Sequence, residues 1–250
     1  MNITPLIDII IPNYNKAKYI KECLESVMSQ TYKNWNIYLI DDDSNDDSKS
    51  ILKEYEKIDN IKLIYLEKTY GPHYCRNVGM ENSTADYVAF LDSDDYWPKE
   101  KLKKQIEEML KNNLDFTYTD ISYFKNNPLI QKKIILPSFY NFNNFILKST
   151  MSTSSIVLNK KILKDIKFKD VKHEDYLFKC EILKTKITAV KVSNTFTFYR
   201  MTNQNRSSNK IKNLKNLWHI NKQYNNLNLV ENLRSTFFII LNSLKNYGWK

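Results

Sequence analysis

One stretch decides the fold and the site of this chain: Asp86-Tyr-Val-Ala-Phe-Leu-Asp92-Ser-Asp94-Asp95-Tyr-Trp97. Residues 87–91 form a short apolar run typical of buried strands, and three carboxylates follow within four residues. Like charges this close raise one another's pKa unless a cation lies among them, and Mg²⁺ and Mn²⁺ bind such oxygens. The alternative is a solvated acidic turn that caps a helix beginning near Pro98.

Length and cysteine content limit the class of protein. The 250 residues suit one large domain, or one domain with an appendage. Cys23, Cys75 and Cys180 are odd in number and form no CxxC pair, which argues against a disulfide framework or a zinc site. The sequence shows no signal peptide and no apolar run of about 18 residues. We therefore expect a cytoplasmic protein without a membrane span.

Charge is distributed unevenly along the chain. Residues 1–96 hold 10 of the 38 Lys and Arg and 17 of the 28 Asp and Glu, a net charge of −7, which leaves +17 for residues 97–250. A basic second half suits nucleic acid, anionic lipid or an anionic substrate. Nucleic acid is disfavoured because the chain has no zinc finger, no RNP signature and no basic region with heptads.

The first half alternates predicted strands with predicted helices. Strands are expected at residues 7–12, 35–40 and 61–66, and helices at 18–30 and 48–57. This order predicts parallel strands with helices on both faces, a doubly wound α/β half. Strand two also ends in acid, at residues 41–47, so two acidic strand ends would line a nucleotide crevice. With three glycines and no GxGxxG, a metal must offset the phosphate charge.

Five motifs in order resemble the family 2 glycosyltransferases of the GT-A fold. They are Ile-Ile-Ile-Pro-Asn-Tyr-Asn at residues 9–15, Ser-Val-Met-Ser-Gln-Thr-Tyr at 26–32, Ile-Asp-Asp-Asp-Ser-Asn-Asp at 40–46, Gly71 with Arg-Asn-Val-Gly at 76–79, and Phe-Leu-Asp-Ser-Asp-Asp at 90–95. The resemblance implies a Rossmann-like, mostly parallel mixed sheet flanked by helices. It also implies an inverting enzyme of bacterial surface polysaccharide assembly, such as lipopolysaccharide or capsule, which uses a nucleotide-sugar donor, usually a UDP-sugar, and Mn²⁺ or Mg²⁺.

The resemblance also implies roles for residues near the donor. Asp42 meets the base, Asp92 lies near the ribose with Ser93 beside it, and Asp94 binds the metal, while Pro12 and Tyr14 belong to the base and ribose pocket. The alternative for Asp42 is N-capping of the next helix, for which Ser44 is an equally good candidate.

Arg76 lies on a helix predicted at residues 74–82, near the acidic strand end. It is a candidate to brace one of the carboxylates there. The alternative is an ordinary surface ion pair, worth at most about 1 kcal/mol.

The second half is patterned less clearly. A helix is expected at residues 99–111 and a strand at 116–124, whereas residues 125–150 show no regular pattern and suit either acceptor-facing loops or irregular packing. The hydroxyls of residues 152–155 suit acceptor contacts or local turn hydrogen bonds.

Glu174 and Asp175 open a further predicted helix. An inverting mechanism needs a carboxylate to deprotonate the acceptor hydroxyl, and the family's Glu-Asp pair places that base at Asp175. Because the two side chains point about 100° apart, we expect only one of them to face the substrate. The alternative is that both simply favour the helix dipole.

A strand at residues 196–200 ends in Arg200, which the family places near the diphosphate. Ser207 and Ser208 match the family's loop, but Thr202 stands where a histidine is common. That puts a third protein ligand to the metal in doubt. A structural ion pair is the alternative for Arg200.

We predict a GT-A domain at residues 1–205, with a nucleotide-binding half at 1–97 and an acceptor-binding half at 98–205, followed by a basic helical appendage at 206–250. The predicted helices at about 211–224 and 229–246 would pack on the domain, form a homodimer, or lie on the inner face of the cytoplasmic membrane. The predicted reaction transfers a sugar to a glycan or lipid-linked glycan hydroxyl. Rival hypotheses are a sugar-nucleotide-binding partner without turnover, and a nucleotidyltransferase.

Overall fold

The first half of the chain has the predicted alternation of strands and helices. A computed structural model describes residues 4–125, 131–201 and 210–247. Its first half contains strands β1 (Ile7–Asn13), β2 (Trp35–Asp41), β3 (Ile61–Tyr65) and β4 (Tyr87–Phe90), and helices α1 (Ala17–Met28), α2 (Ser48–Leu52) and α3 (Pro72–Asn82). β1 pairs in parallel with β2 and with β4, and β2 pairs in parallel with β3. The doubly wound half is confirmed.

The second half adds five strands and five helices within the described residues. They are α4 (Lys101–Asn112), β5 (Phe116–Phe124), β6 (Gln131–Ile134), β7 (Phe139–Tyr140), α5 (Phe142–Lys148), β8 (Val157–Asn159), α6 (Glu174–Lys184), β9 (Ala189–Arg200), α7 (Lys210–Gln223) and α8 (Leu229–Tyr247). The patternless region 125–150 therefore contains β6, β7 and α5. A capping box starts α5, in which Asn141 and Asn144 exchange side-chain to backbone hydrogen bonds.

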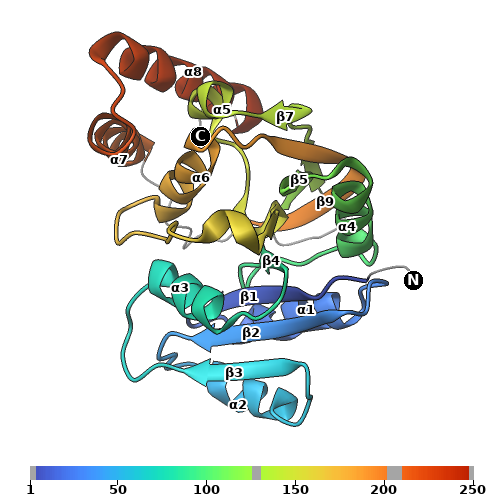
Figure 1. Ribbon diagram of the computed structural model, residues 1–250. Helices are drawn as coiled ribbons and strands as arrows, with labels where there is room; N and C mark the ends of the chain where they lie inside the picture. The colour runs from blue at the N-terminus through green and yellow to red at the C-terminus, as the bar shows by residue number, and fades with distance from the viewer. Residues whose placement is uncertain (1–3, 126–130, 202–209, 248–250) are drawn as a thin grey trace.

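The nine strands of the described residues form one mixed sheet, in the order β3-β2-β1-β4-β8-β5-β9-β7 with β6 paired to β5. The two halves meet where β8 runs antiparallel to both β4 and β5. Figure 1 shows β1, β2 and β3 in one half of the molecule and β5 and β9 in the other. The acidic stretch after β4 therefore lies at the junction of the two halves.

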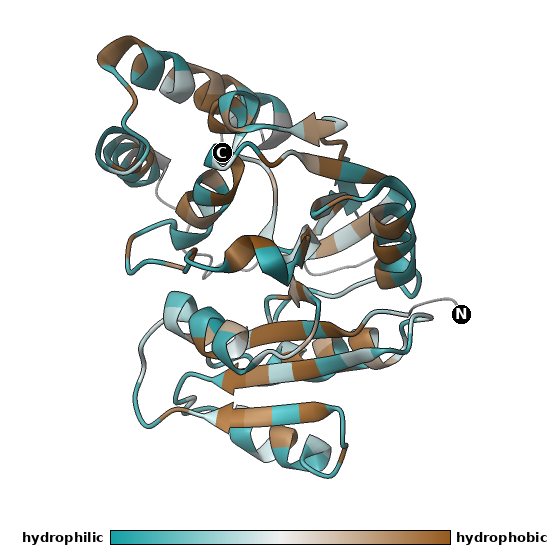
Figure 2. Cartoon of the chain, in the orientation of Figure 1, coloured by the Kyte–Doolittle hydropathy of each residue, from teal (hydrophilic) through white to brown (hydrophobic). Residues whose placement is uncertain are grey.

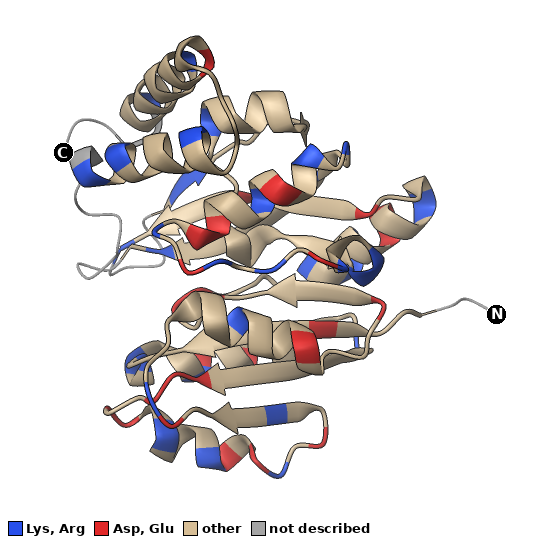
Figure 3. Cartoon of the chain, turned by 60° about the vertical axis from the view of Figure 1, so that its left-hand side comes forward, with Lys and Arg blue, Asp and Glu red and all other residues tan. Residues whose placement is uncertain are grey.

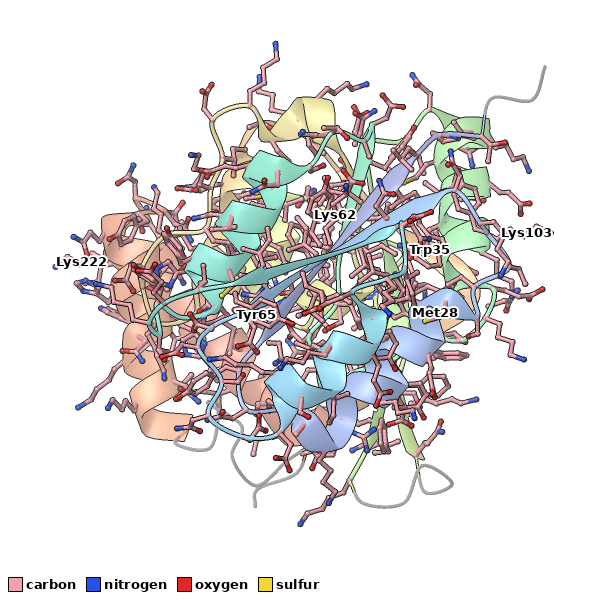
Figure 4. All side chains as sticks on the ribbon, turned by 90° about the horizontal axis from the view of Figure 1, so that it is seen from below. Met28, Trp35, Lys62, Tyr65, Lys103 and Lys222 are labelled. Atoms are coloured by element: carbon pink, nitrogen blue, oxygen red, sulfur yellow. The ribbon has the colours of Figure 1, made fainter. Side chains whose placement is uncertain are left out.

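Helices cover both faces of the sheet. Neighbouring residues of β1 point to opposite faces, so Ile10 packs in one apolar cluster with Cys75 of α3, whereas Ile9 and Ile11 pack in a second cluster with α1. Figure 2 shows strands β1 to β3 mainly in brown and helix α3, on the near side, largely in teal. Seen from below, Lys103 of α4 and Lys222 of α7 lie at opposite sides of the molecule (Figure 4).

Helix α3 lies unusually close to β1. A Cβ on Gly79 would come within 2.5 Å of Ile10 Cγ2, so only glycine allows this approach. The close approach brings Arg76, on the same helix, to the end of β4.

The C-terminal helices pack on α5 and α6. Ser235 Oγ of α8 donates to the Ile146 carbonyl (2.6 Å), and Tyr176 of α6 donates to Asn221 Oδ1 of α7 (2.8 Å). The predicted boundary at residues 205 and 206 lies in 202–209, outside the described residues. Within the described chain, no helix has both the length and the apolarity to span a bilayer.

Candidate active site

A cleft of about 740 Å³ opens beyond the carboxyl ends of β1, β2 and β4, and residues from both halves of the chain line it. Nine of the ten predicted site residues line this cleft: Pro12, Tyr14, Asp42, Arg76, Asp92, Ser93, Asp94, Glu174 and Asp175. The tenth, Arg200, is not among the lining residues. The lining also includes residues 148–153, together with Ile239 and Ser243 of α8.

The acidic turn after β4 is largely buried. Asp95 is 2% exposed and accepts hydrogen bonds from Ser154 Oγ (2.6 Å) and the Arg200 backbone N–H (3.0 Å). Burial, followed by the charges of Asp94 and Asp92, raises the pKa of Asp95 well above its usual range. The alternative of a solvated, helix-capping turn is wrong, because the N-cap of α4 is Glu100 and has no side-chain cap.

Lys16 supplies a cation to this cluster. Its Nζ lies 2.6 Å from Asp94 Oδ2. Burial raises the pKa of Asp94, while the Lys16 charge acts in the opposite direction. Sequence analysis missed Lys16, although it directly follows the 13–15 loop at the end of β1, and that position was an available signal.

The residues of the cleft fit a divalent ion whose remaining ligands come from the substrate. Within residues 4–125, 131–201 and 210–247, no group of three or more His, Cys, Asp and Glu side chains could hold a metal. Asp94 offers one carboxylate, and Mg²⁺ or Mn²⁺ commonly takes one or two carboxylates together with substrate phosphates. Thr202, Ser207 and Ser208 lie outside the described residues.

Arg76 joins the two halves of the cleft. Its Nη2 lies 2.7 Å from Asp92 Oδ1 and its Nη1 lies 3.2 Å from Glu174 Oε1, while the guanidinium stacks over Phe168. The residue is only 4% exposed, so the surface ion-pair alternative is wrong. Burial alone would lower the pKa of Arg76, but Asp92 and Glu174 outweigh burial and raise it.

Asp42 organises the loop that leads into α3. Its two carboxylate oxygens accept the backbone N–H groups of Tyr70 (2.7 Å) and Gly71 (2.8 Å). The capping alternative is wrong, because Asp47 is the N-cap of α2 and Ser44 donates to Asp41 instead. Each oxygen of Asp42 keeps a further lone pair for a ligand in the cleft.

Asp175 and Glu174 both line the cleft, and Glu174 is the one that pairs with Arg76. Buried Lys179, one helical turn later, places its Nζ 2.8 Å from Asp175 Oδ2 and 2.7 Å from the Met151 carbonyl. Burial favours protonation of Asp175, but Lys179, Arg76 and His173 outweigh it and hold its pKa below the usual range. Sequence analysis missed Lys179, although its i, i+4 spacing was a signal.

Arg200 makes structural contacts. It pairs with Glu22, and its Nε donates to the Asp94 carbonyl (3.0 Å). This is the structural ion pair that the sequence left open. In the Ser-rich segment, Ser154 is fully buried and supports the acidic turn, accepting the Asp92 N–H at 3.1 Å.

Comparison with known proteins identifies the family. Residues 8–167 match the model of the family described as "Glycosyl transferase family 2". The chain belongs to this family. This family 2 glycosyltransferase is 33% identical over 238 residues to "UDP-Glc:alpha-D-GlcNAc-diphosphoundecaprenol beta-1,3-glucosyltransferase WfgD" of Escherichia coli, which covers 95% of this chain and 91% of the relative.

Solved structures show the same fold. One is S. aureus TarS 1–349 in complex with UDP-GlcNAc, with a TM-score of 0.72 and 20% identity over 96% of this chain and 72% of that one. Another is the mannosyltransferase PcManGT of Pyrobaculum calidifontis in complex with GDP-Man and Mn²⁺, with a TM-score of 0.71 and 15% identity over 99% and 72%. The sheet, its helices and these likenesses confirm the GT-A fold that the sequence predicted.

Proposed function

We propose that this glycosyltransferase moves a sugar from a UDP-sugar to a hydroxyl of a lipid-linked glycan, with inversion at the anomeric carbon. The observation that carries the proposal is the bridge through Arg76, which holds Asp92, at the end of β4, and Glu174, next to Asp175, around one cleft. The name of WfgD, which gives UDP-Glc as donor and a diphosphoundecaprenol-linked acceptor, supports this choice of substrates.

The donor would occupy the side of the cleft formed by residues 1–97. Pro12, Tyr14 and Asp42 line that side, and the half-exposed ring of Tyr14 is open to a base. A carboxylate such as Asp42 accepts the N3–H of uracil, whereas cytosine presents no N–H there. In this proposal Asp92 and Ser93 contact the ribose.

Charge on the diphosphate would be offset at the acidic turn. Asp94 would hold Mn²⁺ or Mg²⁺, which when bound stabilises the charge that develops on the leaving diphosphate. Lys16, already at Asp94, is a second cation within reach of the same position.

Asp175 would act as the general base, on the side formed by residues 98–205. Asp175 is ionised at neutral pH and 37% exposed, so its carboxylate can accept the proton of the acceptor hydroxyl. The acceptor oxygen then bonds to the anomeric carbon as the bond to the diphosphate oxygen breaks. The nucleoside diphosphate leaves, and the proton stays on Asp175.

Calorimetry tests the donor site first. UDP is titrated with Mn²⁺, then with EDTA, into the wild type, Asp94→Asn and the control Asp43→Asn, whose exposed carboxylate pairs with Lys49 outside the cleft. We expect binding to require Mn²⁺ and to be lost only in Asp94→Asn. UDP binding that is unchanged by EDTA and by Asp94→Asn would overturn the proposal of a metal-dependent site.

Turnover tests the base and the rival hypothesis. Asp175→Asn should bind UDP like the wild type but lose transfer of sugar from UDP-sugars to a diphosphate-linked sugar acceptor, by about 100-fold or more. A wild type that binds UDP yet transfers no sugar from any nucleotide donor would support a binding partner without turnover.

A further inference from the structure

Helix α8 exposes apolar side chains along one stripe. Val230, Leu233, Phe237 and Leu241 are 73%, 54%, 58% and 44% exposed. Their spacing of three and four residues places them on one face of the helix. These four residues are called the α8 stripe below.

The opposite, buried face of α8 holds two polar residues beside the apolar Ile239, which is 8% exposed. Asn232 and Ser235 are 1% and 0% exposed; Asn232 Nδ2 donates to the Trp218 carbonyl (3.0 Å), and Ser235 Oγ donates to the Ile146 carbonyl. A surface helix of a soluble protein normally buries its apolar face and exposes its polar face. In α8, by contrast, most of the large apolar side chains are exposed, and no described residue covers the α8 stripe.

Basic residues accompany the α8 stripe. By helical spacing, exposed Arg234 and Lys245 follow the stripe along one side of α8. Over residues 210–247, six Lys and Arg stand against one acid, Glu231, and Figure 3 shows these basic positions on α7 and α8. An apolar face flanked by cations is the pattern of helices that lie on anionic bilayers.

A second copy of this chain suits the α8 stripe less well than a bilayer does. A two-fold dimer presents the same patch to itself, so it would bring the cations of one copy towards those of the other. An anionic leaflet, in contrast, accepts the apolar side chains and neutralises Arg234 and Lys245 together.

The same helix forms part of the cleft. Ile239 and Ser243, on the inner side of α8, line the wall of the cleft next to Lys148 of α5. An α-helix with its side chains is about 10–12 Å across. A bilayer under the α8 stripe would therefore lie about one helix diameter from the cleft wall.

We infer that α8 lies on an anionic bilayer through the α8 stripe, which holds the cleft beside the lipid headgroups. There a lipid-linked acceptor would present its diphosphate and first sugar. The bilayer contact follows from α8 itself, and only its use for the acceptor rests on the proposed function.

Vesicle flotation tests the bilayer contact without any need for turnover. The full chain is mixed with vesicles of phosphatidylcholine alone or with added phosphatidylglycerol. We expect flotation with the anionic vesicles, weakened by salt, and an affinity reduced about tenfold or more in Leu233→Ser/Phe237→Ser, because two exposed apolar side chains lose their burial. Arg234→Gln should lower only the preference for anionic lipid.

A matched control carries the same change elsewhere. Leu110→Ser/Ile135→Ser removes two apolar side chains that are 48% and 65% exposed, and it should float like the wild type. Far-ultraviolet circular dichroism checks that each variant is folded. The inference would be overturned if the wild type did not float, or if the α8 stripe variant floated equally well. It would also be overturned if light scattering showed that the wild type is a dimer and the α8 stripe variant a monomer.

The two proposals fail separately. Transfer to a short-chain, water-soluble acceptor should be unchanged in the α8 stripe variant. Flotation without any transfer would overturn the proposed function alone, whereas transfer without flotation would overturn the bilayer contact alone.

Discussion

Lys179 Nζ lies 2.8 Å from Asp175 Oδ2, one turn away on α6, and the lysine is 2% exposed while the carboxylate is 37% exposed. The pair therefore has a buried cation beneath a carboxylate that can still reach the cleft. Lys179 also donates to the Met151 carbonyl, which fixes its position. Lys179 therefore fixes the orientation of the Asp175 carboxylate, the proposed base, and favours its ionised form.

Lys179→Met should raise the pKa of Asp175 by about one to three units, because an adjacent cation lowers a carboxyl pKa by that amount. The acidic limb of the kcat/KM profile should then move to higher pH by the same amount. The control is Lys169→Met, which removes the surface ion-pair partner of Glu181, a residue of α6 like Asp175. An unchanged acidic limb would contradict the role of Lys179.

The same pair gives stability a defined pH dependence. Because the folded-state pKa of Asp175 lies below its ordinary value of about 4, the pair contributes stability above that pH and loses it as the pH falls further. Urea unfolding of the wild type and Lys179→Met should converge in acid.

Lys16→Met should tighten binding of Mn²⁺ in the absence of nucleotide by about fivefold, because it removes a charge worth about 1 kcal/mol from Asp94 and frees an oxygen ligand. Electron paramagnetic resonance of free Mn²⁺ measures this directly. Lys18→Met, two residues further along the chain and outside the acidic turn, is the control and should leave Mn²⁺ binding as it is. Weaker binding in Lys16→Met would show that Lys16 supports the ion rather than competing with it.

Arg76→Met should lower the free energy of unfolding by about 3 kcal/mol, the low end for a broken buried ion pair, because the Asp92 and Glu174 side chains that lose their shared partner are 31% and 13% exposed. Arg76→Lys should recover only part of this loss, because one ammonium cannot reproduce two separate guanidinium contacts. The exposed pair of Lys103 and Glu107 provides the control, and Lys103→Met should cost at most about 0.5 kcal/mol. Equal stabilities of the two Arg76 variants would contradict the bridging role.

Lys101→Met should stabilise the protein by about 1–3 kcal/mol at neutral pH. Lys101 is 0% exposed, lies over the Trp97 ring and is among the buried groups without a hydrogen-bond partner in the described part of the chain. Burial lowers its pKa, so the unfolded state binds more protons and the wild type gains stability as pH rises towards about 10. Lys101→Met should lose that slope in urea unfolding, whereas exposed Lys104→Met should keep it.

The parts of the fold that the sequence predicted are those with strong apolar patterns. The run of β-branched and aromatic residues gave β5 its predicted bounds, Phe116–Phe124. By contrast, β9 begins at Ala189 rather than at residue 196. The part that was not predicted lies before an irregularity, where the register to β5 shifts between Thr119 and Asp120 and Asn194 adopts a left-handed conformation (φ 57°). Such a bulge leaves no periodic signal.

The sequence predicted the acidic residues of the candidate site but not the lysines that contact them. Motifs located Asp92, Asp94 and Asp175, since acidic residues at strand and helix ends are conspicuous. Lys16 and Lys179 looked like two of many lysines in a basic chain. Only the fold shows that each lies within hydrogen-bond distance of a site carboxylate.

The Arg76 bridge joins residues that are synthesised at different times, so the cleft is assembled in a defined order. During synthesis α3 and β4 leave the ribosome before α6. Arg76 can therefore pair with Asp92 before Glu174 has been synthesised. A nascent chain can thus assemble the proposed donor side of its cleft, but Asp175, the proposed base, and Glu174, the second partner of Arg76, are absent until α6 emerges. The complete cleft, with both partners of Arg76 in place, therefore forms only after synthesis has passed α6.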